Sequence, residues 1–349
     1  MGLVTMASLE STQTYQTQHE LGFDLIRSVA IFLVICLHVS GVGFANYFSS
    51  SWAAVNAYES FSRVCVPLFF ILSGALLLDK RESLQQLGRR ISKIVIASAA
   101  WSAIFIAWER RHGSNISFFR MIEAPVAFHL WYCYTIIGAY LFLPVMRAVA
   151  QYLNIYSHLF IIGCWVLSVS GVDLLNQFAH ITVGLDLKYY QSYFGFFLIG
   201  NLLIKTRKFQ SRWVTLFAVG WILMVLGTYF STQMLSKLQG QAVGFFYSYY
   251  SPFNIFGSIF AFLFLREVGR TISVVRMAQQ ILKHLSRASF GIYLFHPFAL
   301  DQLSRRFKID YQTGSSWIWI PLTSLACLSI SWVVVSVIQR IPVLRRICP

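Results

Sequence analysis

Long apolar stretches recur along this sequence, and they constrain its fold more than any other feature. A helix needs roughly 20 mostly apolar residues to cross the hydrocarbon core of a membrane. Helices and closed barrels are the structures that satisfy every backbone polar group inside lipid. The lengths therefore predict an all-α, polytopic membrane protein with about ten transmembrane helices. The predicted helices lie at about 22–44, 57–79, 91–109, 128–148, 157–174, 190–205, 212–232, 245–266, 282–303 and 316–340.

The composition agrees with a membrane protein. Hydrophobic residues make up 57% of the 349 residues and charged residues only 12%, against about 25% charged residues in a typical soluble domain. The net charge of +15 would fit a nucleic-acid-binding protein, but Lys and Arg also collect in the cytoplasmic loops of membrane proteins. We therefore expect no nucleic-acid partner. The six cysteines show no metal-ligand spacing and lie mostly in apolar runs, so we expect neither disulfides nor a metal site.

The basic residues also predict the orientation. Most Lys and Arg residues between the predicted helices fall on the side of the N-terminus, which predicts that both termini are cytoplasmic. Residues 1–20 are polar and lack the features of a signal peptide, so we expect a disordered cytoplasmic tail. Residues 21–340 are predicted to form the transmembrane domain, and residues 341–349 a short cytoplasmic tail.

The first predicted helix contains three ionisable residues in "FDLIRSVAIFLVICLHVSG", residues 23–41. Ionisable groups are costly inside a membrane and usually face a cavity or a partner. Arg27 and His38 are 11 positions apart, so they differ in direction by about 20° and lie about 16 Å apart along the axis. Asp24 lies three residues before Arg27 and can pair with it. The sequence predicts a polar stripe that runs from the cytoplasmic end of this helix into its outer half.

Three further segments place polar or aromatic residues at the predicted depth of His38 or nearer the outer surface. They are "SRVCVPLFFILSGALL", "FHLWYCY" and "FGIYLFHP". We expect their side chains to line a cavity or to contact an acceptor substrate. The candidates are Arg63, His129, Trp131, Tyr293 and His296.

Some of these residues have simpler explanations. His129 beside Trp131 also fits an aromatic belt at the membrane surface, and His296 before Pro297 also fits a helix-packing residue.

On the cytoplasmic side, "LGRRISKIV" places a basic cluster where the third predicted helix begins. This cluster is either ordinary positive-inside charge or a phosphate-binding site. It consists of Arg89, Arg90 and Lys93.

These residue types favour acyl transfer. A neutral histidine in a cavity is suited to act as a general base on a hydroxyl group, and clustered arginines bind phosphates well. We therefore expect a phosphate-rich acyl-CoA donor at the basic cluster and His38 as the base. A transporter of a small polar or acylated solute fits the same helices and charges, and a scaffold without a small-molecule site is a third alternative.

Four features of the sequence point together to one family. They are "FDLIR" with the spacing from Arg27 to His38, "SRVCVPLFFILSGALLL", "FHLWYCYTIIGAYLFLP" and "SFGIYLFHP". With these features the chain resembles the acyltransferase-3 family of multispanning membrane acyltransferases. The resemblance covers nearly the whole chain. It is closest to the standalone bacterial O-acetyltransferase branch, that of the enterobacterial common antigen O-acetyltransferase. The family often has Arg-x-x-Arg at the third helix, whereas this sequence has Arg90-Ile-Ser-Lys93, and Lys lacks the forked geometry of Arg.

The resemblance implies an O-acetyltransferase in a bacterial inner membrane. It implies acetyl-CoA as a co-substrate, with no bound cofactor, and a lipid-linked or polymeric cell-envelope glycan as the acceptor. It also implies that His38 is the catalytic histidine and that Arg27, beside Asp24, supports it. Direct transfer and transfer through an acetylated His38 are both compatible with these residues.

Overall fold

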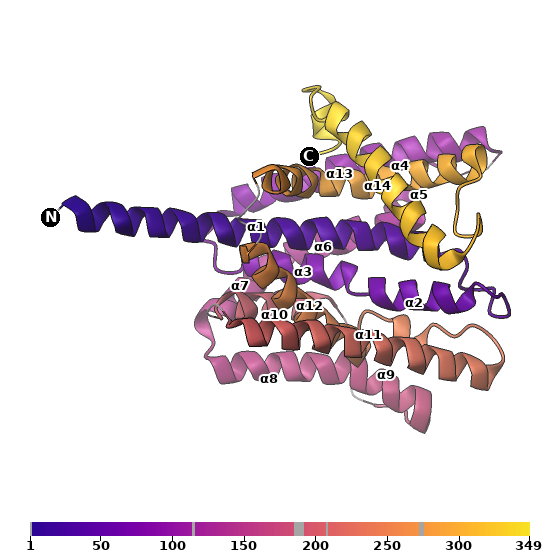
Figure 1. The fold of residues 1–349 in the computed structure, drawn as a ribbon, viewed down its shortest axis with the longest axis horizontal. Helices are drawn as coiled ribbons and strands as arrows, with labels where there is room; N and C mark the ends of the chain where they lie inside the picture. The colour runs from indigo at the N-terminus through magenta and orange to yellow at the C-terminus, as the bar shows by residue number, and fades with distance from the viewer. Residues whose placement is uncertain (1, 114–115, 185–191, 207–208, 272–275) are drawn as a thin grey trace.

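The computed structural model describes residues 2–113, 116–184, 192–206, 209–271 and 276–349. The described residues form helices joined by loops, without strands, and most of the long helices run along one common direction (Figure 1). This confirms the predicted all-α, polytopic fold. The helices are α1 (Gly2–Gly41), α2 (Trp52–Ser62), α3 (Cys65–Leu77), α4 (Leu84–Arg111), α5 (Arg120–Glu123), α6 (Trp131–Leu141), α7 (Leu143–Tyr152), α8 (Ile155–Val166), α9 (Val172–Leu174), α10 (Phe194–Ile204), α11 (Ser211–Gln239), α12 (Pro252–Thr271), α13 (Arg276–Phe307) and α14 (Ser316–Ile338).

Fewer helices meet the length and apolarity of a membrane span than the sequence predicted. Among the described residues 7 helical segments are long and apolar enough, and the pair formed by α5–α6 and α7, bent by 53°, makes an eighth. The other two predicted spans correspond to α10, which has only 11 residues, and to α13, which is long but carries many charged residues. The 7 segments are Leu21–Gly41, Trp52–Leu77, Leu84–Arg111, Ile155–Ala179, Ser211–Gln239, Phe245–Arg270 and Ser316–Ile338.

The two terminal segments that the sequence predicted as cytoplasmic tails stay a prediction, and the structure describes one feature of each. Helix α1 begins at Gly2, and its first part projects beyond the other helices (Figure 1). Residues 3–20 contain neither Gly nor Pro, so no residue there interrupts a helix that continues from the membrane span. At the other end, the Trp101 indole donates a hydrogen bond to the Ile347 carbonyl at 2.9 Å, and Cys348 is buried. The C-terminal residues therefore pack against α4.

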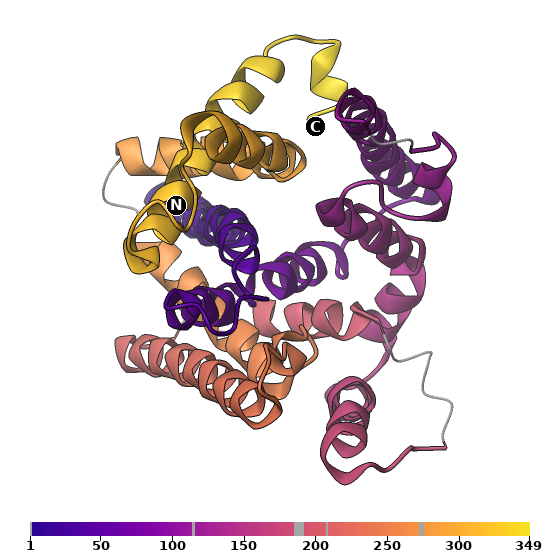
Figure 2. The ribbon, with the colours of Figure 1, turned by 90° about the vertical axis from the view of Figure 1, so that its right-hand side faces the viewer.

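Helix α1 lies inside the bundle. It packs against α2, α3, α12, α13 and α14, and the view along the helices shows it among them, with the pink α8 at the edge (Figure 2). Helices α3 and α10 approach each other closely at two glycines. A Cβ atom on Gly200 would lie 1.9 Å from the Ile71 carbonyl oxygen, and one on Gly74 would lie 2.0 Å from the Phe197 carbonyl oxygen. Backbone therefore meets backbone at this crossing, as small residues permit in membrane helices.

The span Trp52–Leu77 is interrupted in its middle. Helix α2 ends at Ser62 and α3 begins at Cys65, with Arg63 and Val64 in a turn between them. Pro67 lies four residues after Arg63. Proline has no amide hydrogen and its ring clashes with the carbonyl four residues earlier, so Pro67 favours a break in the helix at Arg63. The break leaves the Arg63 side chain at mid-span.

Candidate functional site

Two cavities follow one another along the bundle. We call the first the arginine cavity; it has a volume of about 320 Å³. We call the second the histidine cavity; it has a volume of about 420 Å³ and contains His38. The polar residues lining the arginine cavity are Arg27, Ser73, Arg90, Lys93, Tyr132, Tyr140, Ser289 and Tyr293. Those lining the histidine cavity are His38, Trp108, Glu109, Asp301, Ser304, Asp310, Tyr311 and Thr323.

The same helices line both cavities. Helix α1 contributes Arg27 to the arginine cavity and His38 to the histidine cavity, and α13 contributes Tyr293 and then Asp301. Helix α4 likewise contributes Lys93 near its start and residues near its end. Since these three helices each pass from one cavity to the other, the cavities occupy opposite halves of the bundle.

Three histidines meet between the two cavities. The ring of His38 stacks on the ring of His296 with centroids 5.2 Å apart and an interplanar angle of 15°. The ring of His129 meets His296 edge-on at 5.4 Å. Tyr293, which lines the arginine cavity, lies with its ring 5.5 Å from that of His129, and its hydroxyl donates to the His129 carbonyl. The structure thus brings His38, His129, Tyr293 and His296 together.

The histidine contacts indicate where protons can be held. His296 Nδ1 lies 2.7 Å from the Tyr293 carbonyl oxygen. A carbonyl can only accept, so Nδ1 carries the hydrogen and Nε2 of the neutral ring has the free lone pair. That Nε2 is buried and has no hydrogen-bond partner among the described residues. His38 is held by ring contacts with His296 and Phe128, and it borders the histidine cavity.

The basic residues separate into two groups. Arg27 forms the predicted ion pair with Asp24, with 3.6 Å between Arg27 Nη1 and Asp24 Oδ1. The same Nη1 lies 3.5 Å from the Oγ of Ser286 on α13. Arg27, Arg90 and Lys93 line the arginine cavity. Arg89 is exposed and is not part of that lining. On a helix, positions 90 and 93 differ in direction by about 60° and positions 89 and 93 by about 40°, so helix geometry alone does not separate Arg89 from this pair.

An acidic residue at this end of the bundle was not identified from the sequence. Glu82 lies in the segment before α4 and binds two arginines, Arg90 at 2.7 Å and Arg147 at 2.8 Å. Desolvation raises the pKa of the Glu82 carboxyl, but the hydrogen bonds and charges of Arg90 and Arg147 outweigh it, so the pKa lies below its ordinary value. Glu82 therefore occupies an anion-binding position between two guanidinium groups.

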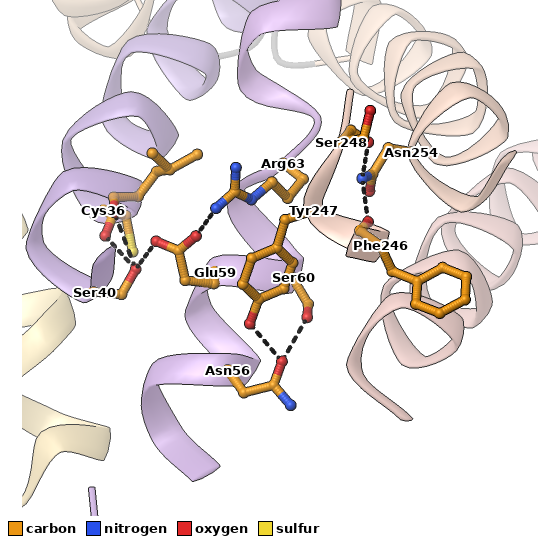
Figure 3. A network of polar contacts seen from close by, with 11 residues as sticks. Cys36, Ser40, Asn56, Glu59, Ser60, Arg63, Phe246, Tyr247, Ser248 and Asn254 are labelled. Carbon is orange, nitrogen blue, oxygen red and sulfur yellow. Dashed lines mark hydrogen bonds and ion pairs between the residues drawn. The ribbon is translucent and has the colours of Figure 1, made fainter. Parts of the chain in front are cut away.

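Arg63 lies in a polar network with Glu59 and Tyr247 (Figure 3). Its guanidinium forms an ion pair with Glu59 and lies over the Tyr247 ring, 4.4 Å from the centroid. Glu59 is 1% exposed and also accepts a hydrogen bond from Ser40 Oγ at 3.0 Å. The Tyr247 hydroxyl in turn donates to Asn56 Oδ1 at 2.6 Å. The spacing of Glu59 and Arg63, four residues apart on a helix, is a signal that could have revealed this pair.

Trp131 lies away from the three histidines. Its ring stacks on Tyr249 at 6.0 Å and lies 6.0 Å from Tyr193. These tyrosines and Arg63 border a third hollow of about 440 Å³, which we call the tyrosine cavity. The contacts of Trp131 join segments far apart in the sequence, so no local pattern could have predicted them.

No group of three or more His, Cys, Asp and Glu side chains among the described residues is arranged to hold a metal ion. The three histidines contact one another through their rings, which is a packing arrangement rather than convergence of ring nitrogens on one point. The arrangement can bind an anion at one end and can accept a proton at the other.

The fold defines a polytopic membrane protein whose helix bundle contains two cavities along its length. Residues 20–337 match the model of the acyltransferase-3 family, which is described as an acyltransferase domain. The chain belongs to this family and is a membrane acyltransferase. No curated protein and no solved structure gives a significant match to the chain.

Proposed function

We propose that the protein moves an acetyl group from cytoplasmic acetyl-CoA to a hydroxyl group of a cell-envelope saccharide, in a bacterial inner membrane, with His38 as the general base. One observation carries this proposal. Arg27, Arg90 and Lys93 line one cavity, and His38 lines the other. Ring contacts from Tyr293 at the first cavity, through His129 and His296, lead to His38 at the second. A charged donor and a neutral acceptor can therefore approach the same point from opposite sides.

The donor fits the arginine cavity. The phosphates of CoA are best held by guanidinium and ammonium groups, and Arg90 and Lys93 begin α4 at the wall of this cavity. The narrow pantetheine arm would then extend past Arg27 towards Tyr293. Since the positive-inside bias places this end of the bundle in the cytoplasm, the cavity would receive acetyl-CoA from the compartment that contains it.

The acceptor fits the histidine cavity. Aromatic side chains and carboxylates suit a sugar, because rings cover its apolar faces and carboxylates accept its hydroxyl hydrogens. Here Trp108, Phe298 and Tyr311 provide rings, and Glu109 and Asp301 provide carboxylates.

The reaction follows from this arrangement. His38 takes the proton of the acceptor hydroxyl, and the oxygen forms a bond to the thioester carbonyl carbon. The bond from that carbon to sulfur then breaks, and the CoA thiolate takes the proton. Arg27, paired with Asp24, would hold the donor. An acetylated His38 intermediate is an alternative route with the same products.

The test is acetyl transfer by purified protein. Wild-type protein should release CoA from acetyl-CoA only when an envelope saccharide is present, and mass analysis should find an added acetyl group on that saccharide. His38→Ala should lower the rate by roughly 10²–10⁴-fold, the usual contribution of a general base. His158→Ala is the matched control, because His158 is buried in α8 and lines neither cavity. Full activity of His38→Ala would remove His38 as the base.

A transporter is the second candidate, since two cavities on either side of a constriction also suit alternating access. Vesicle uptake of a solute without CoA release would favour it. Acetylated saccharide, formed without net uptake, would exclude it.

A further inference from the structure

The tyrosine cavity is a third built hollow that the reaction at His38 does not use. Four of its lining residues are tyrosines, and their rings contact one another and nearby aromatic residues. Tyr193 and Tyr250 lie 5.0 Å apart between ring centroids. The residues that line the cavity are Phe44, Arg63, Tyr193, Gly244, Tyr247, Ser248, Tyr249 and Tyr250.

Its walls come from four separate segments, of which Phe44 in the turn after α1 is the first. Arg63 comes from the break between α2 and α3, Tyr193 from the residue before α10, and the remaining tyrosines from the loop before α12. Asn254 fixes that loop, because its Nδ2 donates to the carbonyls of Phe246 at 2.9 Å and Ser248 at 2.8 Å (Figure 3). A loop fixed in this way can present its rings in a defined arrangement.

The chemistry of the cavity suits a neutral polyol. The positive charge of Arg63 is balanced by Glu59, so the site has no excess charge to attract a phosphate. Arg63 Nε is buried and has no hydrogen-bond partner among the described residues. Half-buried aromatic rings can bind the apolar face of a sugar ring. A guanidinium held in place beside them can donate hydrogen bonds to the hydroxyl oxygens of that sugar.

The position of the cavity connects it to the site of transfer. Val42 lines the histidine cavity and Phe44 lines the tyrosine cavity, so the two hollows flank one turn after α1. A chain of contacts also joins them, because Ser40, two residues after His38, binds Glu59, and Glu59 binds Arg63. A saccharide lying across residues 42–44 would contact both cavities.

We propose that the tyrosine cavity is a second sugar-binding subsite, which holds a sugar of the acceptor chain next to the one acetylated at His38. This inference rests on the proposed function for the identity of the reaction. It adds that the acceptor is an oligosaccharide or polymer and that binding strength increases once the chain is long enough to reach Tyr249.

The experiment uses purified full-length protein and a ladder of oligosaccharides, from one sugar unit to six, released by mild acid from the envelope glycan of cells that carry the gene. Affinity is measured by calorimetry, and acetyl transfer is measured on the same samples. Tyr249→Ala should weaken binding of the longer saccharides about tenfold, as expected for loss of one aromatic contact, and should leave the monosaccharide unchanged.

Three further variants make the result interpretable. Tyr249→Phe keeps the ring and should bind nearly as wild type, whereas Tyr249→Leu keeps the bulk without an aromatic face and should behave as Tyr249→Ala. Tyr156→Ala on α8 is the remote control, because Tyr156 is 80% exposed and lines none of the three cavities.

The outcomes separate the two proposals. If wild type binds longer saccharides more tightly and Tyr249→Ala abolishes this dependence on length, the subsite is supported. This holds even if no acetyl group is transferred, and in that case only the proposed function fails. If acetyl groups are transferred, but wild type and Tyr249→Ala bind long saccharides with equal affinity, the subsite is overturned. The proposed function is then still supported. An equal loss for the monosaccharide and the longer chains also overturns it, because Tyr249 would then act at the reaction site itself.

Discussion

The close crossing of α3 and α10 makes a quantitative prediction about Gly200. In Gly200→Ala the new Cβ would lie 1.9 Å from the Ile71 carbonyl oxygen and 2.9 Å from the Ala75 nitrogen. Both atoms belong to the backbone of α3, so no side-chain rotation relieves the clash. Real Cβ contacts are essentially never shorter than 3.0 Å, and the two helices must therefore separate by about 1 Å in a tightly packed interior.

The separation is costly. Overpacking by one methyl group typically lowers the free energy of unfolding by about 1–3 kcal/mol. Because this clash involves backbone atoms that cannot rotate away, we expect a loss at the upper end of that range, about 3 kcal/mol. We expect the midpoint of thermal unfolding in detergent to fall by roughly 4 °C. Helix α3 also supplies Phe69, Leu72 and Ser73 to the wall of the arginine cavity. The KM for the acyl donor should therefore rise in the same variant.

Two further glycine substitutions test the reasoning. Gly74→Ala places its Cβ 2.0 Å from the Phe197 carbonyl oxygen and should destabilise the protein similarly. Gly163→Ala on α8 meets no heavy atom within 4 Å and should be neutral or stabilising by up to about 1 kcal/mol, because alanine favours the helix. If Gly200→Ala unfolds at the wild-type temperature while Gly163→Ala behaves as expected, α3 and α10 do not cross at backbone contact.

Two other variants test the charged clusters. Glu59→Gln leaves the mostly buried Arg63 without its counter-charge and should destabilise the protein by about 3 kcal/mol in chemical or thermal unfolding; an unchanged stability would mean that Arg63 is solvated. The pKa of Glu82 is lower in the folded protein than its ordinary value. The ionised Glu82 therefore stabilises the fold at every pH above the ordinary glutamate pKa, and this contribution is lost as the pH falls through the lowered pKa of the folded protein. The difference in unfolding midpoint between wild type and Glu82→Gln should therefore be largest near pH 7 and shrink below about pH 4; a pH-independent difference would contradict the pairing with Arg90 and Arg147.

Some of the site was predictable because it depends on helix geometry alone. The spacing of Arg27 and His38 predicted one face and an axial separation, and the structure places the two residues in successive cavities on α1. The Asp24–Arg27 pair followed from the same periodicity. Residues Arg90 and Lys93 share a face for this reason too, but the same rule also groups Arg89 with Lys93, so it could not have predicted that Arg89 lies outside the cavity.

Other features depend on contacts between distant segments. Glu82 binds Arg147 across 65 positions of sequence, and Tyr293 contacts His129 across 164. No periodicity encodes such pairs. For another reason, the predicted number of spans differs from the number of helices that are long and apolar enough. Helix α13 carries Tyr293, His296 and Asp301 to the cavities or to the histidines between them, so the residues that serve the site also reduce its average apolarity.

The stacked histidines have a consequence for the membrane itself. Each imidazole binds and releases one proton, and three of them in ring contact lie between cavities that occupy opposite halves of the bundle. Such a row could dissipate an ion gradient if water filled it continuously. The phenyl rings of Phe128 against His38 and Phe105 against His129 border this row with apolar surface. If His38 is the proposed base, this apolar border would limit water at the junction, and a proton taken from a substrate would stay within the reaction instead of crossing the bilayer.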